Sequence, residues 1–417
     1  MGGAQRMINS EPTVSILPSG LKLVHIPAIF SQSAIFGIMV KAGSASETQD
    51  DFGLAHFVEH TIFKGTSRRK ASYIINRMEA VGGELNAFTT KEETSVYSIF
   101  PSGYTARAIA LIAELISESV FPDSELEKER DVVIEEINSY LDTPIDAAYD
   151  TFEDIIFQGT PLGHNILGTK ESVQNLTSAH CRAFLDKFYV ANNMVAFYSG
   201  PETADKIYRL LEKNFASLPV GEANDSIIPS STKEYGKTVE HAEIHQAHAV
   251  YGIRTANMFS PDRYAVSLFT NIIGGPGMNS LLNVGLRERR GLVYTVEATS
   301  AFFSSQGLIT IYYGCDADEY IHCINCIKQL MERLAGSKSP LTDRRLEAAK
   351  RQYLGQTAIA SENRENRIMA AAKATLFRGT PTTGAQFIDA INAVTPQQIK
   401  DIAQDFTNGN FFAYVPM

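Results

Sequence analysis

Two histidines and a glutamate within five residues form the group of side chains best suited to chemistry. The segment reads His56-Phe-Val-Glu59-His60. On a helix that turns about 100° per residue, His60 lies about 40° from His56, and Glu59 lies about 60° to the other side. Two imidazoles at this spacing suit Zn²⁺, and Glu59 is placed to take a proton from a metal-bound water. The alternative is an amphipathic helix whose polar face happens to carry these three side chains.

A catalytic zinc needs a third protein ligand, and the segment 124–142 offers two carboxylates for this role. Glu129 and Glu136 are seven residues apart, so on a helix they lie about 20° from each other. We prefer Glu136 as the ligand and expect Glu129 behind it, while Glu135 points nearer to solvent. The alternative is a solvated helix face. The preference rests on three apolar residues expected within about 60° of Glu136: Val132, Val133 and Tyr140.

The elements that must position these side chains follow from periodicity in the first half of the chain. Apolar alternation predicts strands, and apolar residues at helical spacing predict helices, one of which ends at Gly82-Gly83. The expected strands are 14–26, broken by a turn, 33–41, 84–100 and 194–199, and the expected helices are 52–64, 71–81, 104–118, 124–142 and one ending near 184–189.

The second half of the chain repeats this order after a stretch rich in Pro, Gly, Ser, Asn and Asp at 218–237, which is typical of a linker. We therefore expect a zinc-binding domain at 1–217, the linker at 218–237 and a second domain at 238–417. Strand–helix blocks interrupted by hairpin-like strands favour an α+β fold. The expected elements here are strands 247–254 and 308–314, and helices 262–273, 318–334 and 341–360, with a further helix after Gly274–Gly277.

Composition excludes several classes of protein. With 44% hydrophobic and 20% charged residues, the 417-residue chain is neither disordered nor fibrous. Its 37 basic and 47 acidic residues give a net charge of −10, which disfavours nucleic acid and anionic membranes as partners. The sequence lacks a secretory or transit pattern and an apolar run that could span a membrane, and its four cysteines suit a reducing compartment. We expect a soluble, cytoplasmic protein.

The order His56-x-x-Glu59-His60, followed by Glu129 and Glu136, resembles the M16 metallopeptidases, a family that includes pitrilysin, insulin-degrading enzyme and mitochondrial processing peptidase. H-x-x-E-H is the inverzincin signature. The similarity is greatest to the bacterial processing-peptidase-like branch. Further stretches that carry the resemblance are Gly82-Gly-Glu-Leu-Asn-Ala-Phe-Thr89, Pro161-Leu-Gly-His-Asn-Ile-Leu-Gly168 and Leu286-Arg-Glu-Arg-Arg-Gly-Leu-Val-Tyr294.

The resemblance implies a fold and a set of site residues. The fold would be two homologous α/β rolls joined by the linker. Two such chains would face each other around a closed chamber, with substrate extended along an edge strand at Asn86, Ala87 and Phe88. Arg287 and Tyr294 would reach the zinc site from the facing half. There Arg287 would hold the substrate backbone and Tyr294 would stabilise the oxyanion.

The resemblance also implies the cofactor and the partners. One zinc per chain is expected, because the second half carries no H-x-x-E-H. Since one chain holds both the zinc set and the Arg/Tyr pair, a homodimer is expected, with a heterodimer with another chain of the family as the alternative. The implied activity is zinc-dependent endopeptidase hydrolysis of unfolded peptides or presequence-like segments, with Glu59 as general base.

Two other functions and one other site are kept as alternatives. The chain could be a non-catalytic scaffold subunit of a larger complex, or its zinc could be purely structural. The cluster His241, His245 and His248 could bind a second metal, but residues 245 and 248 of a strand would face opposite sides. His25 and His164 are interpreted as structural residues.

Overall fold

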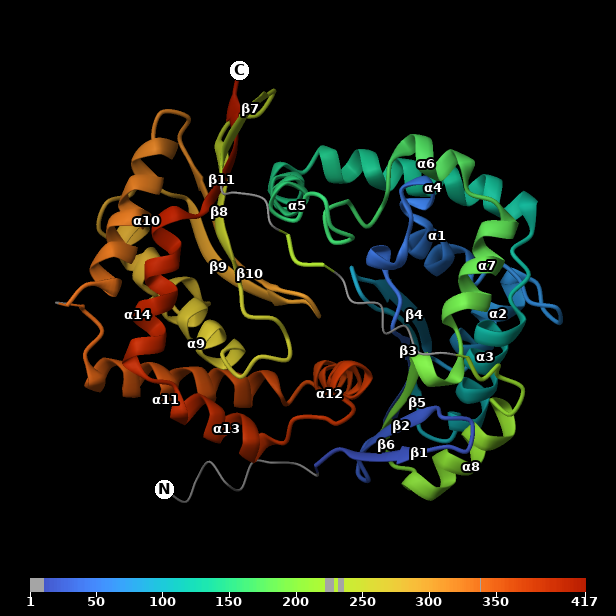
Figure 1. The fold of residues 1–417 in the computed structure, drawn as a ribbon. Helices are drawn as coiled ribbons and strands as arrows, with labels where there is room; N and C mark the ends of the chain where they lie inside the picture. The colour runs from blue at the N-terminus through green and yellow to red at the C-terminus, as the bar shows by residue number, and fades with distance from the viewer. Residues whose placement is uncertain (1–10, 222–228, 232–235, 338) are drawn as a thin grey trace. The chain divides into compact units, whose positions relative to one another are not determined.

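A computed structural model describes residues 11–221, 229–231, 236–337 and 339–417. The chain forms two compact units, each built around one β-sheet with helices, which confirms the α+β class (Figure 1). Neither unit is continuous in sequence. The first comprises Met1–Ile137, His164–Ser226 and Ile359–Gly384, and the second comprises Asn138–Gly163, Ile227–Ala358 and Ala385–Met417.

A division of the chain at 218–237 would therefore place two segments in a different unit from the one to which they belong in the structure. Segment 138–163 of the first half belongs to the second unit, and segment 359–384 of the second half belongs to the first. Most of the expected linker, at 222–228 and 232–235, lies outside the described residues. The domain boundaries stay a prediction. An exchange of helices between units cannot be recognised from local periodicity.

The first unit contains a six-stranded sheet in the order β1-β2-β6-β3-β5-β4. Only β2 and β6 pair in parallel, and the other neighbours are antiparallel. Strand β4 pairs with β5 alone and is therefore an edge of the sheet. The strands are β1 (Thr13–Ile16), β2 (Lys22–Pro27), β3 (Ser33–Val40), β4 (Glu84–Thr89), β5 (Thr94–Pro101) and β6 (Met194–Gly200).

The single strand expected over 84–100 is wrong, because the structure has a hairpin there. Between β4 and β5 the chain turns at 90–93, where the Thr90 N–H donates to the Glu93 carbonyl at 2.8 Å. The Thr90 hydroxyl also accepts the N–H groups of Glu92 and Glu93. Such a side chain competes with strand pairing and favours a turn, although no Gly or Pro marks the position.

Helices cover both faces of the first sheet. One face carries the main core, with α1 (Leu54–Thr61), α2 (Ala71–Glu79), α3 (Thr105–Glu118), α4 (Asp123–Leu141), α6 (Lys170–Asn175), α7 (Ser178–Phe188) and α8 (Ala204–Asn214). Short 3₁₀ turns stand at η2 (Ser44–Ser46), η3 (Gln49–Asp51) and η4 (Ala191–Asn193). The opposite face packs against α12 (Arg364–Arg378), which contacts β6, β2 and β3.

The second unit contains a five-stranded sheet in the order β7-β11-β8-β10-β9. Helix α5 contacts β8 and β11, while α9, α10 and α14 pack with the main core of this unit. The strands are β7 (Lys237–Ala242), β8 (Ala247–Thr255), β9 (Thr295–Phe302), β10 (Gly307–Cys315) and β11 (Asn410–Pro416). The helices are α5 (Pro144–Ile156), α9 (Arg263–Gly274), η5 (Asn283–Glu288), α10 (Tyr320–Ala335), α11 (Asp343–Ala360), α13 (Gly384–Ala393), α14 (Pro396–Asp405) and η6 (Phe406–Asn408).

The helices and strands expected from periodicity are confirmed to within a few residues, apart from the 84–100 hairpin and the helix expected after Gly277, which is the π-helical η5. Among the described residues, no helix combines the length and the apolar character that crossing a membrane requires.

Candidate metal centre

Helix α1 carries both histidines, and its first turn is fixed in three ways. Gly53 caps the helix with φ of 91°, and a Cβ at this position would lie 2.6 Å from the Leu167 carbonyl oxygen. Only glycine adopts this conformation at such a close approach without strain. The Glu47 carboxylate accepts the N–H groups of Gly53 at 2.9 Å and Ala55 at 2.7 Å. These groups lack partners within the helix, and a negative charge beside them is favourable.

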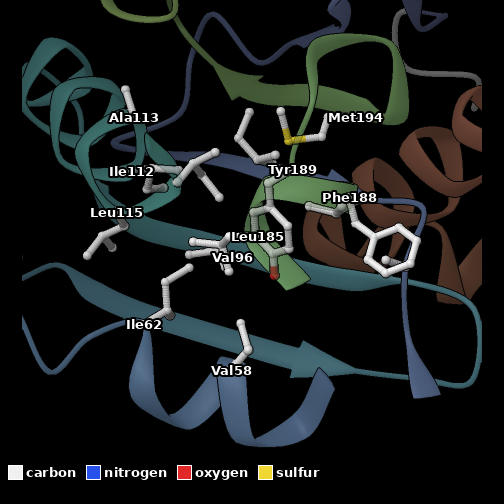
Figure 2. Close-up of a cluster of buried hydrophobic side chains, with 14 of the residues drawn as sticks. Val58, Ile62, Val96, Ile112, Ala113, Leu115, Leu185, Phe188, Tyr189 and Met194 are labelled. Atoms are coloured by element: carbon white, nitrogen blue, oxygen red, sulfur yellow. The ribbon is translucent and has the colours of Figure 1, made fainter. Parts of the chain in front are cut away.

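The apolar side of α1 holds the helix against the core. Leu54, Phe57 and Val58 are buried. Figure 2 shows Val58 and the following Ile62 among side chains that come from β5, α3 and α7. Because this side is packed, the polar positions 56, 59 and 60 are held on the rest of the helix surface, as the sequence predicts.

Helix α4 supplies the carboxylates, but its apolar face differs from the expected one. Val133 is buried, whereas Val132 is 50% exposed and Tyr140 is 40% exposed. The expectation that all three lie on a buried face beside Glu136 is therefore wrong for two of them. The buried side runs through Leu126, Val133 and Ile137 and includes Glu129, which is 7% exposed. Glu129 is thus more deeply buried than Glu136.

The structure brings His56, His60 and Glu136 together, with one potential ligand atom of each within 4.8 Å of the others. Glu136 Oε2 lies 3.3 Å from His60 Nε2 and 3.6 Å from His56 Nε2. In a tetrahedral site with ligands at about 2.0–2.1 Å from zinc, two ligands lie about 3.3–3.4 Å apart. The two nitrogens and one carboxylate oxygen therefore fit a zinc ion, and three protein ligands would leave a fourth tetrahedral position for water.

Behind this set, Glu129 orients His60. Glu129 Oε1 lies 3.1 Å from His60 Nδ1, and Oε2 lies 2.6 Å from Lys64 Nζ. A proton on Nδ1 leaves Nε2 as the lone-pair nitrogen, which is how an outer carboxylate prepares a histidine for metal. Burial alone would raise the pKa of Glu129, but its hydrogen bonds with His60 and Lys64 lower it.

The two imidazoles differ in their electrostatic surroundings. Burial and the nearby His60 lower the pKa of His56 to about 3, so this ring stays neutral and able to bind metal in mild acid. Burial lowers the pKa of His60 as well, but the bond to Glu129 and the charges of Glu136, Glu59 and Glu129 outweigh it, so the net shift is upward. The carboxylates around His60 therefore favour its protonated form.

Glu59 lies against the edge strand. Its carboxylate accepts hydrogen bonds from the Thr89 hydroxyl and the Thr89 backbone N–H. Burial raises its pKa, and the charge of Glu136 adds to that rise, while the Thr89 bonds and His60 act against them. A raised pKa brings a carboxylate closer to the range in which a general base works at neutral pH.

The Thr89 contact also sets which backbone groups β4 offers at the sheet edge. Backbone groups alternate between the two sides of a strand. Since the Thr89 N–H points to Glu59 rather than to β5, the groups of Ala87 and Leu85 point to the same open side. The Thr90 N–H bonds to the Glu93 carbonyl, so by the same alternation Phe88 and Asn86 direct their backbone groups toward Ser95 and Tyr97, their register partners on β5. The edge position expected for Asn86, Ala87 and Phe88 is present, and of these three Ala87 directs its backbone to the open side.

Arg287 and Tyr294 lie in the second unit. Arg287 is an exposed residue of η5, and Tyr294 precedes β9 and is 54% exposed. The Tyr294 hydroxyl donates to Asp316 Oδ1 at 2.8 Å, and this bond raises the pKa of the hydroxyl. Their expected part in the reaction stays a prediction.

Several residues that shape the site have no catalytic or ligand role in the sequence analysis. Lys64 and Thr89 contact Glu129 and Glu59, and Glu47 fixes the start of α1. His164, expected to be structural, lies with its Nε2 3.2 Å from Glu47 and stacks on Phe52. For Lys64 the sequence does contain a signal. It lies four residues after His60, and at helical spacing two such side chains face the same side.

The other histidines do not form a second metal site. His25 bonds to the Glu202 carbonyl, in line with a structural residue. His241 and His248 lie on β7 and β8, which are separated by β11, and they bond to Pro416 and Tyr312. Among the described residues, the set His56, His60 and Glu136 is the one group suited to holding a metal ion.

Comparison with protein families matches both halves of the chain. Residues 24–170 match the model described as insulinase, peptidase family M16, and this range includes His56, His60 and Glu136. Residues 175–353 match the model described as the peptidase M16 inactive domain.

Relatives and solved structures cover nearly the whole chain. A protein of Mycobacterium leprae named as an uncharacterized zinc protease is 30% identical over 405 residues, which are 96% of this chain and 90% of the relative. One of Bacillus subtilis with the same description is 29% identical over 89% of this chain and 90% of its own. A solved peptidase M16 inactive domain from Pseudomonas fluorescens has a TM-score of 0.88 at 19% identity, and a protease from Helicobacter pylori has 0.88 at 18%. The first covers 98% of both chains, and the second covers 98% of this chain and 100% of its own, so the fold is shared throughout.

Together the two matched ranges cover most of the chain, and the zinc-ligand geometry lies in the range of the first. The chain belongs to peptidase family M16.

Proposed function

We propose that the protein is a zinc-dependent metalloendopeptidase. The observation that carries this proposal is the convergence of His56 Nε2 and His60 Nε2 on Glu136 Oε2 at 3.6 and 3.3 Å, close to the ligand spacing of a tetrahedral zinc site. The names of the curated relatives, which are zinc proteases, support it.

The residues around the three ligands have different roles in the proposed reaction. Zinc, when bound, polarises a carbonyl and acidifies water. Glu59 accepts the proton at its carboxylate and returns it to the leaving amine of the peptide. Thr89 holds the Glu59 carboxylate in place, and Glu129 keeps His60 Nδ1 protonated. Each contact therefore fixes either a proton position or a ligand orientation.

The edge strand β4 supports an extended peptide as substrate. By alternation along β4, the N–H and C=O groups of Ala87 point to the same side as the Thr89 N–H that binds Glu59, so a peptide added there by β-pairing would run past the general base. Main-chain pairing of this kind depends little on side-chain sequence. We propose unfolded peptides or presequence-like segments as substrates.

Substitutions in the site test the activity with the full chain loaded with zinc and an unstructured peptide as substrate. Glu59→Gln should retain about one zinc per chain and lose at least 100-fold in kcat, because it removes the proton acceptor. Glu136→Gln should lose the zinc, whereas Glu135→Gln, at the exposed neighbouring position, should retain both metal and activity. Full turnover by Glu59→Gln would refute the mechanism. Unfolding on zinc removal would indicate a structural metal.

We further propose that the protein works as a homodimer in which Arg287 and Tyr294 of one chain complete the metal site of the other. Mixing two inactive variants tests this. In a mixed dimer of Glu59→Gln and Tyr294→Phe chains, one of the two sites would hold both intact residues if Tyr294 acts across the dimer. Activity should then reappear on mixing. Continued inactivity of mixed dimers, or a monomer in light scattering, would refute the arrangement.

A further inference from the structure

A cavity lies within the first unit, on the face of the sheet that packs against α12. Its volume is about 320 Å³, and it is lined by the end of β2, the turn that follows, Ser199 of β6 and two arginines of α12. Volumes near this size are typical of small-molecule sites. None of its lining residues is a ligand or a base of the metal centre.

The lining of the cavity includes a buried hydroxyl, that of Ser199. Ser199 pairs with Ile26 of β2 and with Ile35 of β3, and it follows Val195 and Phe197 on the same face of β6. These neighbours are apolar, and Ser199 is 1% exposed. Its Oγ has no hydrogen-bond partner among the described residues. Burying an unpaired hydroxyl costs free energy, so this position is explained if a ligand in the cavity accepts its hydrogen bond.

Two guanidinium groups line the same cavity. Arg364 and Arg367 lie in the first turn of α12 and are partly buried, and this burial lowers the pKa of both. Arg364 donates to the Ser33 carbonyl at 3.0 Å and to the Ser33 hydroxyl at 2.6 Å, both uncharged acceptors. The charge of the exposed Glu11 acts to raise the pKa of Arg367. Glu365, which lies between the two arginines in sequence, accepts a hydrogen bond from the Tyr97 hydroxyl. Two guanidinium groups therefore line the cavity, with the carboxylate of Glu11 near Arg367.

Part of the cavity lining is apolar. The turn after β2 contributes Ile29, which is 66% exposed, and Phe30, which is 92% exposed, and Ile26 of β2 also lines the cavity. A bare inorganic ion would leave this apolar surface unused. An anion with an attached hydrocarbon or aromatic group would cover it while its charged end reaches the arginines.

We propose that this cavity binds a small organic anion. Its carboxylate or phosphate group is held by Arg364, Arg367 and the Ser199 hydroxyl, and its apolar part packs on Ile26 and Phe30. Guanidinium groups pair with both oxyanions in forked geometry, so the shared chemistry is an oxyanion head with an apolar body.

Calorimetric titration of the full zinc-loaded chain with benzoate, phenyl phosphate, inorganic phosphate and benzyl alcohol tests the site. We expect the organic anions to bind at least tenfold more tightly than inorganic phosphate, and benzyl alcohol not to bind. The stronger of benzoate and phenyl phosphate identifies the head group. Absence of binding by both would overturn the proposal.

Variants locate the binding. Ser199→Ala should weaken it by about tenfold, the value of a hydrogen bond to a charged group, without lowering Tm, because it removes an unpaired hydroxyl. Arg367→Gln should weaken it by at least tenfold, and Arg378→Gln, the same charge change in the last turn of α12, should not. Loss of binding in Glu136→Gln with full binding in Ser199→Ala would place the anion at the metal centre and refute this site.

Discussion

Substituting Glu129 by Gln tests whether the residue behind His60 tunes the metal site. The carboxylate contacts His60 Nδ1 at 3.1 Å, so an ion held by His60 Nε2 would lie beyond the imidazole ring from it, at about 7 Å. At an effective dielectric constant of about 20, one charge attracts a divalent ion at that distance by about 5 kcal/mol. Lys64, 2.6 Å from the carboxylate, cancels most of this attraction. We expect a residual effect of about 1.4–2.8 kcal/mol, which is a 10–100-fold increase in the zinc Kd.

The zinc Kd is measured by competition with a chromogenic chelator, and Tm is measured on the metal-free protein to confirm folding. Lys64→Met provides a control of opposite sign, because it leaves the Glu129 charge uncancelled and should keep or lower the zinc Kd. Wild-type zinc affinity in Glu129→Gln would refute the reasoning, as would an equal weakening by both substitutions.

Three further outcomes follow from the packing and charges around α1. In denaturant titration, Gly53→Ala should destabilise the protein by more than about 2 kcal/mol, because it adds a clash with Leu167 to the cost of positive φ. The control Gly103→Ala should show the backbone cost alone, since Gly103 has φ of 98° and no atom lies within 4 Å of the added Cβ. Tyr189→Phe should raise the free energy of unfolding by up to about 1 kcal/mol, since the buried Tyr189 hydroxyl has no hydrogen-bond partner among the described residues; a loss of stability would show that it has one. With a folded pKa of about 3, neutral His56 stabilises the metal-free protein above its unfolded pKa near 6.5, and this contribution is lost as the pH falls. Between about pH 6 and 4, wild type should therefore lose about 1.4 kcal/mol per pH unit more than His56→Asn in urea titrations, and parallel curves would contradict the low pKa.

The zinc ligands could be predicted from sequence because their spacing encodes their geometry. His56 and His60 come from one helical turn, and helical periodicity alone brings them to one side. Glu136 comes from another helix, and it was preferred over Glu135 on an expected apolar face that is only partly present: Val133 is buried, whereas Val132 and Tyr140 are exposed. That Glu136 meets the two histidines therefore depends on how α4 packs on α1, which local pattern does not contain.

Contacts between distant segments were beyond the sequence analysis for a related reason. The hydrogen bonds of Thr89 to Glu59 and of Glu47 to the start of α1 join residues of different elements, and nothing in the spacing of either residue marks them. The exchange of α5 and α12 between the units is similar, since each helix has an ordinary amphipathic pattern and its partner sheet is fixed only by tertiary packing. The 90–93 turn was missed because a threonine hydroxyl replaces the usual Gly or Pro signal.

The balance of charge explains why this group of side chains suits a divalent ion. Glu59, Glu129 and Glu136 bring three carboxylates to the site, and Lys64 brings one ammonium, so two negative charges remain when both imidazoles are neutral. Without metal, these charges raise the pKa of His60, so a proton on that ring replaces part of the missing positive charge. A divalent ion removes the need for that proton and leaves His60 Nε2 free as a ligand. His56, whose pKa is lowered to about 3, cannot take the same part, which makes His60 the ring at which proton and metal compete.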